Sequence, residues 1–129
     1  MVALRKLYTP QEANRALPLV RAIARDVRDT AVRIRAIWGE LQATDGASAS
    51  RREELGSQLD DERARLQALT RELEELGVEL KDPMVGLLDF RARRGGGEVY
   101  LCWRLGEERV EFWHECDAGF AGRQPIDTF

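Results

Sequence analysis

Residues 98–125 read EVYLCWRLGEERVEFWHECDAGFAGRQP. This stretch contains both cysteines, the single histidine and two of the three tryptophans of the chain. Apolar and polar residues alternate through most of it, and glycines interrupt the alternation, which is typical of short antiparallel strands joined by turns. The pairing of these strands decides which side chains share a face, so a functional site is expected in this stretch.

The alternation extends upstream and predicts three antiparallel strands, at residues 87–93, 98–105 and 109–116. Residues 81–86 include a proline and a glycine, and they are predicted to form the turn that precedes the first strand. Residues 117–125 contain two further glycines. This half of the chain is therefore predicted to be a three-stranded antiparallel β-meander followed by a glycine-rich C-terminal tail.

Two hairpin pairings set the expected strand register. Arg94 is placed opposite Gly97 in the first hairpin, and Leu105 opposite Val110 in the second. With these pairings, one face of the sheet carries most of the apolar residues of all three strands, and His114 lies on that face. The other face carries opposite-charge cross-strand pairs, which would stabilise the same register.

The expected register bears on the chemistry of the two cysteines. Cys102 and Cys116 would point to opposite faces, so no disulfide is expected between them, because the side chains of a disulfide must face each other. Only His114 and Cys116 would share a side, and two ligands do not make a zinc site. The sequence therefore predicts two free thiols, no metal and no other cofactor.

The N-terminal half has the three- and four-residue spacing of amphipathic helices. Thr9, Pro10 and Glu12 make a helix start with a capping box, and a helix is predicted at about residues 10–43. Pro18 lies inside this helix and removes one backbone donor. A kink or a break is therefore expected near residues 14–18.

A second helix is expected after Ser50, which would cap it with Glu53 at the capping-box position. Its leucines keep the heptad spacing as far as Gly77, which would end the helix. Glu62 is the one polar residue in this seam, and it is expected to face an opening or to pair with an arginine. Two such helices joined by a short linker fold back as an antiparallel hairpin.

The expected fold is α+β, in a single domain that spans residues 1–129. Residues 9–77 form a long, coiled-coil-like antiparallel helical hairpin, and residues 78–129 form the small antiparallel sheet and the tail.

A two-helix hairpin covers only one stripe of each helix. Ile23, Val32 and Ile37 lie outside the main seam of the first helix and also need to be covered. A homodimer that forms a four-helix bundle through the hairpins is expected on this ground. The alternative is a monomer with an exposed helical arm.

The composition excludes several classes of protein. The chain has 129 residues, of which 43% are hydrophobic, and its formal net charge is −3. This charge argues against a general nucleic-acid-binding protein, which usually presents a basic face. No apolar run approaches the ~18–20 residues that span a bilayer, and the N-terminus lacks the apolar region of a signal peptide. A cytoplasmic protein with no nucleic-acid or membrane partner is expected.

The candidate ligand-binding residues lie around the end of the third strand and in the tail. Two glycines three positions apart let the tail reverse, so that Arg123 can approach His114 and bind a small anion such as a carboxylate or phosphate. The alternative is a structural strap, with Arg123 paired to Asp117 or Glu115. The full candidate set is Arg104, Trp113, His114, Glu115, Asp117 and Arg123.

Two functions from different classes follow from these observations. The first, which the sequence favours, is a non-enzymatic binding or scaffold protein that self-associates through its hairpin and binds a protein partner or a small anion with its sheet and glycine-rich tail. The second is a small-anion- or metal-dependent protein or enzyme, with its site around His114, Glu115, Asp117 and Arg123. No residue set matches a reaction that can be named, so no catalytic residue is assigned.

Several segments of the chain resemble a bacterial family known as domain of unknown function 2203. They are YTPQEAN at 8–14, LP at 17–18, LGVELKDP at 76–83, GLLDF at 86–90, VYLCWRLGE at 99–107, WHE at 113–115 and DAGFAGRQP at 117–125. The resemblance covers nearly the whole chain and implies a small prokaryotic cytosolic protein. It implies no particular activity, cofactor or catalytic residue. Cys116 stands where the resemblance leads us to expect an aliphatic residue.

Overall fold

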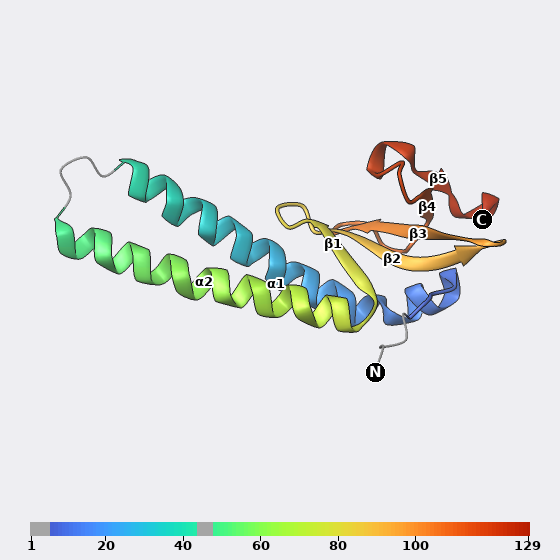
Figure 1. The fold of residues 1–129 in the computed structure, drawn as a ribbon, viewed down its shortest axis with the longest axis horizontal. Coiled ribbons are helices and arrows are strands. Elements are labelled where there is room, and N and C mark those ends of the chain that lie inside the picture. The colour runs from blue at the N-terminus through green and yellow to red at the C-terminus, as the bar shows by residue number, and fades with distance from the viewer. Residues whose placement is uncertain (1–5, 44–47) are drawn as a thin grey trace.

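The computed structural model describes residues 6–43 and 48–129. Two long helices come first and a five-stranded antiparallel sheet follows, so the fold class is α+β. Figure 1 shows that the two helices lie side by side and extend well beyond the sheet, which packs at one end of the hairpin. The elements in chain order are α1 (Pro10–Ala43), α2 (Ala49–Glu75), β1 (Val78–Asp82), β2 (Leu87–Arg94), β3 (Gly97–Arg104), β4 (Phe112–Glu115), the 3-10 helix η1 (Phe120–Gly122), β5 (Gln124–Pro125) and the 3-10 helix η2 (Ile126–Thr128).

The start of α1 follows the sequence. The backbone N–H of Thr9 donates to Glu12 Oε1 at 3.0 Å, and the N–H of Glu12 donates to Thr9 Oγ1 at 3.1 Å, which is the predicted capping box. The helix then runs through Pro18 without a break. Of the two alternatives, a kink or a break, the break is therefore wrong, and the kink stays a prediction. The side chain of Asn14 holds this part of α1 on the sheet, because its amide accepts from the N–H of Val110 at 2.8 Å and donates to the Val110 carbonyl at 3.2 Å.

The start of α2 differs from the prediction by two residues. Ser48, rather than Ser50, is the N-cap, and its side chain accepts a hydrogen bond from the N–H of Arg51 at 3.2 Å. The capping-box glutamate is therefore not used, and Ser50 lies inside the helix. The other end is as predicted, since Gly77 follows the last turn with a φ of 81°, a conformation that glycine adopts without strain.

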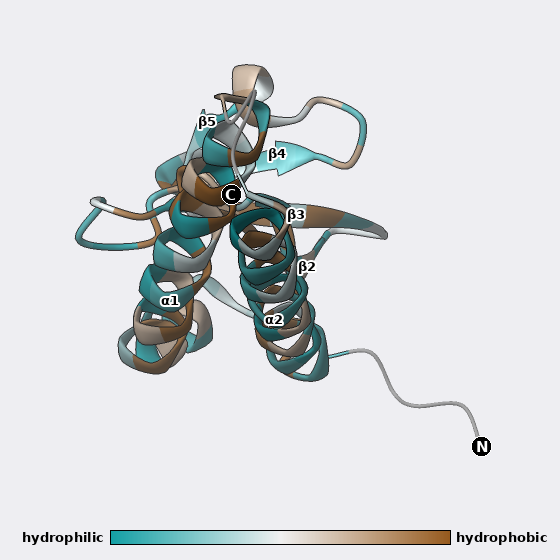
Figure 2. Cartoon of the chain, turned by 90° about the vertical axis from the view of Figure 1, so that its left-hand side faces the viewer, coloured by the Kyte–Doolittle hydropathy of each residue, from teal (hydrophilic) through white to brown (hydrophobic). Residues whose placement is uncertain are grey.

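The core lies where the hairpin meets the sheet. The predicted seam of α1 is buried from Leu17 to Ala31, and the predicted pairing of Glu62 with an arginine is confirmed by its contact with Arg33 Nε at 3.2 Å. Further along α1, Val32 and Trp38 are 48% and 49% exposed. Figure 2, which looks along the hairpin, shows that the outer surface of α2 is mostly hydrophilic. Among the described residues, neither helix is long and apolar enough to cross a membrane.

The sheet has two strands that the sequence analysis did not predict. β1 pairs with β2 and begins before the segment that was expected to be a turn, and β5 in the tail pairs with β4. The expected pairing of Arg94 with Gly97 is confirmed. The strand order is β1-β2-β3-β4-β5, so each strand lies beside its neighbour in sequence.

The expected register of β4 is wrong by one residue. Tyr100 pairs with His114 and Leu101 with Trp113, whereas the expected pairing of Leu105 with Val110 would place His114 opposite Leu101. The cause is that both members of the expected pair bind other partners. The N–H of Leu105 donates to the Gly86 carbonyl, and the backbone of Val110 is bound by Asn14.

A shift of one residue moves every side chain of a strand to the other face. Trp113 therefore lies in the hydrophobic core, together with Leu101 and Trp103. His114 lies on the opposite face, and Asp89 and Cys102 point to the same face. The reason is that His114 pairs with Tyr100, which is two residues from Cys102 on β3, and Cys102 pairs with Asp89. Directly paired residues share a face, and so do residues two apart on one strand.

Candidate functional site

Three side chains capable of binding a metal meet on the face of the sheet that looks away from the core. They are Asp89 of β2, Cys102 of β3 and His114 of β4, and their exposed fractions are 2%, 1% and 2%. One donor atom from each residue can be chosen so that all three atoms lie within 4.8 Å of one another. Ionisable groups buried to this degree are rare unless they are paired or bind a metal.

The hydrogen bonds of His114 fix the orientation of its ring. Nδ1 lies 2.6 Å from the carbonyl oxygen of Glu115, and Nε2 lies 3.0 Å from Asp89 Oδ1. A carbonyl oxygen only accepts, so Nδ1 carries a proton and Nε2 of the neutral ring is an acceptor. The contact between Nε2 and the carboxylate then requires one further cation, either a proton shared by the two groups or a metal ion between them.

Burial disfavours the charged forms of the other two residues. Burial raises the pKa of Asp89, and the hydrogen bond to His114 opposes that effect. Burial, together with the nearby Asp89 carboxylate, raises the pKa of Cys102 to about 12. A thiol with this pKa is protonated at neutral pH and is a poor nucleophile, which argues against a cysteine hydrolase. A divalent cation reverses this preference, because a coordinating thiol loses its proton.

A cavity of about 160 Å³ opens beside these three side chains. It lies between the sheet and the tail, where Gly119 has a φ of 64°. The residues that line it, besides Asp89, Cys102 and His114, are Lys81, Leu87, Tyr100, Cys116, Gly119 and Phe120.

A network centred on Glu79 lies at one side of the cavity. The Glu79 carboxylate accepts hydrogen bonds from Lys81 Nζ at 2.9 Å and from Tyr100 Oη at 2.8 Å, and from Arg91 Nε at 3.0 Å. Partial burial alone would raise the pKa of Glu79, but these three donors outweigh it and lower the pKa to about 2. Burial and the Glu79 carboxylate raise the pKa of Tyr100 to about 12, so this phenol stays neutral.

The structure separates the residues predicted for the site. Of the six candidates, His114 is in the cluster, whereas Trp113 is in the core and Glu115 and Asp117 are exposed. Arg104 is exposed as well, with its guanidinium 5.6 Å from the ring centroid of Phe120. The six candidate residues are therefore not brought together in one pocket.

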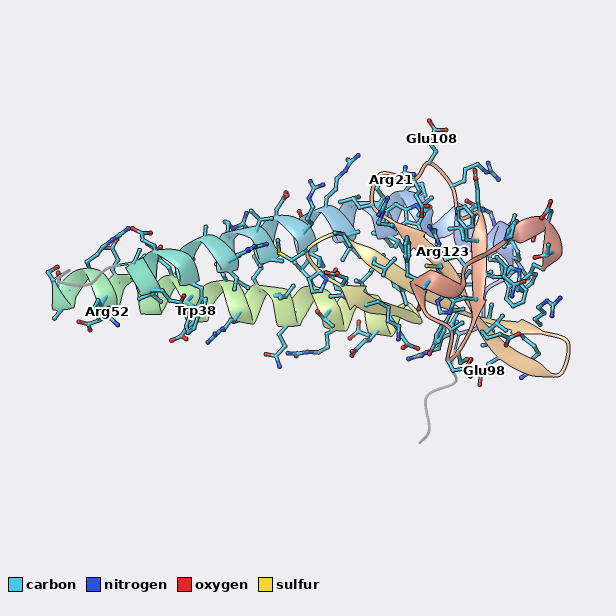
Figure 3. All side chains as sticks on the ribbon, turned by 90° about the horizontal axis from the view of Figure 1, so that it is seen from above. Arg21, Trp38, Arg52, Glu98, Glu108 and Arg123 are labelled. Carbon is cyan, nitrogen blue, oxygen red and sulfur yellow. The ribbon has the colours of Figure 1, made fainter. Side chains whose placement is uncertain are left out.

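Arg123 fastens the tail to the sheet. Its guanidinium donates to Glu107 Oε1 at 2.7 Å and to the Cys102 carbonyl at 3.3 Å. It also lies 4.0 Å from the ring centroid of Phe112 and 4.6 Å from that of Phe120. Figure 3 shows Arg123 among the elements at the sheet end of the molecule, far from the tip of the hairpin. These contacts are those of a strap, although its partner is Glu107 rather than Asp117 or Glu115.

The two cysteines are free, but not for the reason that the sequence suggested. Cys102 and Cys116 both line the cavity instead of pointing to opposite faces. Since Val99 pairs with Glu115, continuation of the register would place Cys116 beside Glu98, and Cys116 Sγ does donate to the Glu98 carbonyl. Glu98 and Cys102 are four residues apart on β3, and four residues along a strand separate the Cα atoms by about 13 Å. Cys116, beside Glu98, is therefore too far from Cys102 for a disulfide, which needs the two Cα atoms to lie within about 7 Å.

Comparison with known proteins identifies the family. Residues 6–126 match the family model described as "Uncharacterized conserved protein (DUF2203)". The chain belongs to this family. No curated protein and no solved structure matches the DUF2203 chain. Asp89, Cys102 and His114 all lie within the matched residues.

Proposed function

We propose that this DUF2203 protein binds a divalent transition-metal ion, most suitably Zn²⁺, through Asp89, Cys102 and His114. The observation that carries the proposal is the convergence of three buried nitrogen, sulfur and oxygen donors within 4.8 Å. Imidazole, thiolate and carboxylate are the side-chain ligands of zinc in proteins. Metal–ligand distances of ~2.0–2.3 Å in a tetrahedral site separate the ligand atoms by roughly 3.3–3.8 Å, so little movement is needed to form it.

The surroundings of His114 support the proposal. The Glu115 carbonyl holds the proton on Nδ1, which leaves Nε2 as the ligating atom. Such a hydrogen bond from the second ring nitrogen is found at most metal-bound histidines. A divalent ion would take the place of the proton between Nε2 and Asp89, and it would balance the charges of one carboxylate and one thiolate.

Three protein ligands next to a cavity are the arrangement of catalytic rather than structural zinc sites, because the fourth position is left for water or for a ligand. The cavity of about 160 Å³ lies beside all three proposed ligands. The metal centre therefore favours the second of the two functions considered from the sequence, a metal-dependent protein, with a ligand set that shares only His114 with the set predicted there.

Metal analysis tests the proposal. After incubation with Zn²⁺ and removal of free metal, the full chain should retain about one ion, and Co²⁺ in its place should give a thiolate-to-cobalt charge-transfer band in the near ultraviolet. Cys102→Ser should abolish the band. Cys116→Ser is the matched control and should keep it, since Cys116 Sγ is bound to the Glu98 carbonyl. A chain that retains no more metal than Cys102→Ser, or a band that persists in that variant, would refute the metal centre.

A second proposal concerns self-association through the hairpin. Val32 and Trp38 of α1 are about half exposed, and tryptophan is a frequent anchor of protein interfaces. α1 contains six arginines and four acidic residues, whereas α2 contains five arginines and eight acidic residues. Because the two helices carry opposite net charges, a dimer in which α1 of one chain lies beside α2 of a second copy is favoured. These observations support the homodimer that the sequence led us to expect.

Light scattering tests the dimer. The parent should have twice the chain mass of 14.7 kDa, and Trp38→Glu should have the mass of the monomer. Leu19→Glu is the control, because Leu19 is 56% exposed but lies near the opposite end of α1. Figure 3 shows Trp38 close to the tip of the hairpin. A parent chain that is monomeric at micromolar concentration would contradict the proposal.

A further inference from the structure

The cavity beside the proposed metal centre limits the size of any ligand. Its volume of about 160 Å³ is well below that of a pocket for a drug-sized molecule, which is roughly 300–1,000 Å³. A protein cavity of about 150 Å³ holds a molecule such as benzene. The apolar side chains of Leu87 and Phe120 form part of the lining. A ligand here is small and has an apolar portion.

Lys81 lines this cavity and gives it a positive charge. The Glu79 network contains two cationic groups, Lys81 and Arg91, and one carboxylate, and Tyr100 is neutral, so one positive charge is left in excess. Lys81 lies over the Tyr100 ring, with Nζ 5.0 Å from its centroid, and its side chain is 39% exposed. An ammonium has three donors, and the hydrogen bond to Glu79 uses one of them.

Lys81 also lines the same cavity as the three proposed metal ligands, Asp89, Cys102 and His114. The cavity has a volume of only about 160 Å³, so an anion held there by Lys81 is next to the fourth position of a metal bound at Asp89.

The charge of the Glu79 network limits the charge of the ligand. With one positive charge in excess, the network favours a ligand with a single negative charge, directed toward Lys81.

We infer that the site binds a small monocarboxylate with an apolar body. One carboxylate oxygen occupies the fourth position of the metal, the other accepts a hydrogen bond from Lys81, and the apolar body packs against Leu87 and Phe120. This inference rests on the proposed metal centre. It adds the class of ligand and names Lys81 as the residue that selects for it.

Visible absorption of the Co²⁺-loaded full chain tests the inference, with benzoate, phthalate and inorganic phosphate as probes. Benzoate should shift the cobalt d–d bands with saturation. Phthalate, which carries a second carboxylate, should bind at least about tenfold more weakly, because the Glu79 network has only one positive charge in excess and the cavity of about 160 Å³ has little room for the second carboxylate. Phosphate binding as tight as benzoate binding would overturn the assignment to carboxylates.

Two lysine variants make the test specific. Lys81→Met should weaken benzoate binding by about tenfold and leave Co²⁺ binding unchanged, because a charge-assisted hydrogen bond is lost. Lys6→Met is the matched control, since Lys6 Nζ also lies 5.0 Å from a tyrosine ring, that of Tyr8, and Lys6 does not line the cavity. Equal benzoate affinities of both variants would overturn the role of Lys81.

The two proposals fail in different ways. Absence of the thiolate-to-cobalt band refutes the metal centre itself. A normal band combined with d–d bands that do not respond to benzoate refutes only the carboxylate ligand.

Discussion

In the presence of a metal chelator, His114→Ala should lower the free energy of unfolding by about 3–5 kcal/mol. His114 and Asp89 are both buried, and His114 Nε2 lies 3.0 Å from Asp89 Oδ1. Removal of one partner of a buried pair leaves the other without compensation in a medium of low polarity. Urea denaturation followed by circular dichroism measures the change, with chelator present so that metal binding does not contribute.

The double variant Asp89→Leu/His114→Leu is the informative control. Replacement of both partners of a buried pair by apolar residues of similar volume is often neutral or stabilising. The double variant should therefore recover most of the loss while it fails to bind Co²⁺. That outcome would mean that the polar cluster contributes to binding rather than to stability. A loss below about 1 kcal/mol for His114→Ala would contradict the energetic coupling of the pair.

The helical hairpin could be predicted from the sequence because its determinants are local. Thr9 and Glu12 are three residues apart, and their hydrogen bonds are those of the predicted capping box. Apolar spacing along each helix was enough to identify the seam. The predicted N-cap of α2, Ser50, is two residues later than the observed one, Ser48. Serine is a good N-cap at either position, and the sequence alone does not rank the two.

The first β-hairpin could be predicted for the same reason. The two-residue connection between Arg94 and Gly97 fixes its register, and that register correctly places Asp89 opposite Cys102. Two of the three proposed metal ligands were thus adjacent in the prediction. The acidic Asp89 between the apolar residues Leu88 and Phe90 was the signal that could have drawn attention to it.

The third ligand was misplaced because the register of β4 depends on a long-range contact. Val110 is bound by Asn14, a residue 96 positions earlier in the chain, and no local pattern reveals that contact. A sheet register that is wrong by one residue puts a side chain on the wrong face. The predicted register therefore places His114 on the core face, away from Asp89 and Cys102, and for that reason it predicts no metal site.

The unpredicted strands have a simpler explanation. β1 has only five residues and ends immediately before Pro83. The proline indicates a turn, and the alternation of Val78 and Leu80 is too short to predict a strand against that indication. β5 has two residues and contains Pro125, which is unfavourable in a strand except at an edge. It does lie at the edge of the sheet, beside β4.

Arg123→Ala should destabilise the protein by about 1–3 kcal/mol, because it removes the strap that holds the tail. The Arg123 and Glu107 side chains are 13% and 22% exposed, and their contact at 2.7 Å is therefore only weakly screened by solvent. The substitution leaves Glu107 with its hydrogen bond from the backbone N–H of Arg104 and without the guanidinium. It also removes the packing of the guanidinium against Phe112 and Phe120.

Arg104→Ala is the matched control for the strap. Arg104 is exposed, and its guanidinium lies 5.6 Å from the Phe120 ring, so its loss should cost less than about 0.5 kcal/mol. Thermal melts and urea denaturation of the two variants compare the effects. A strap predicts a clear difference, with the larger loss for Arg123→Ala, and the stability difference between the parent and Arg123→Ala should not change on addition of benzoate or phosphate. A difference that increases on addition of either anion would instead identify Arg123 as a ligand-binding residue, since an anion that bound there would stabilise the parent and not the variant. Equal losses for the two arginines would show that the pair with Glu107 contributes little, and that the short strand β5 and the contacts of Trp113 with Thr128 and Phe129 hold the tail instead.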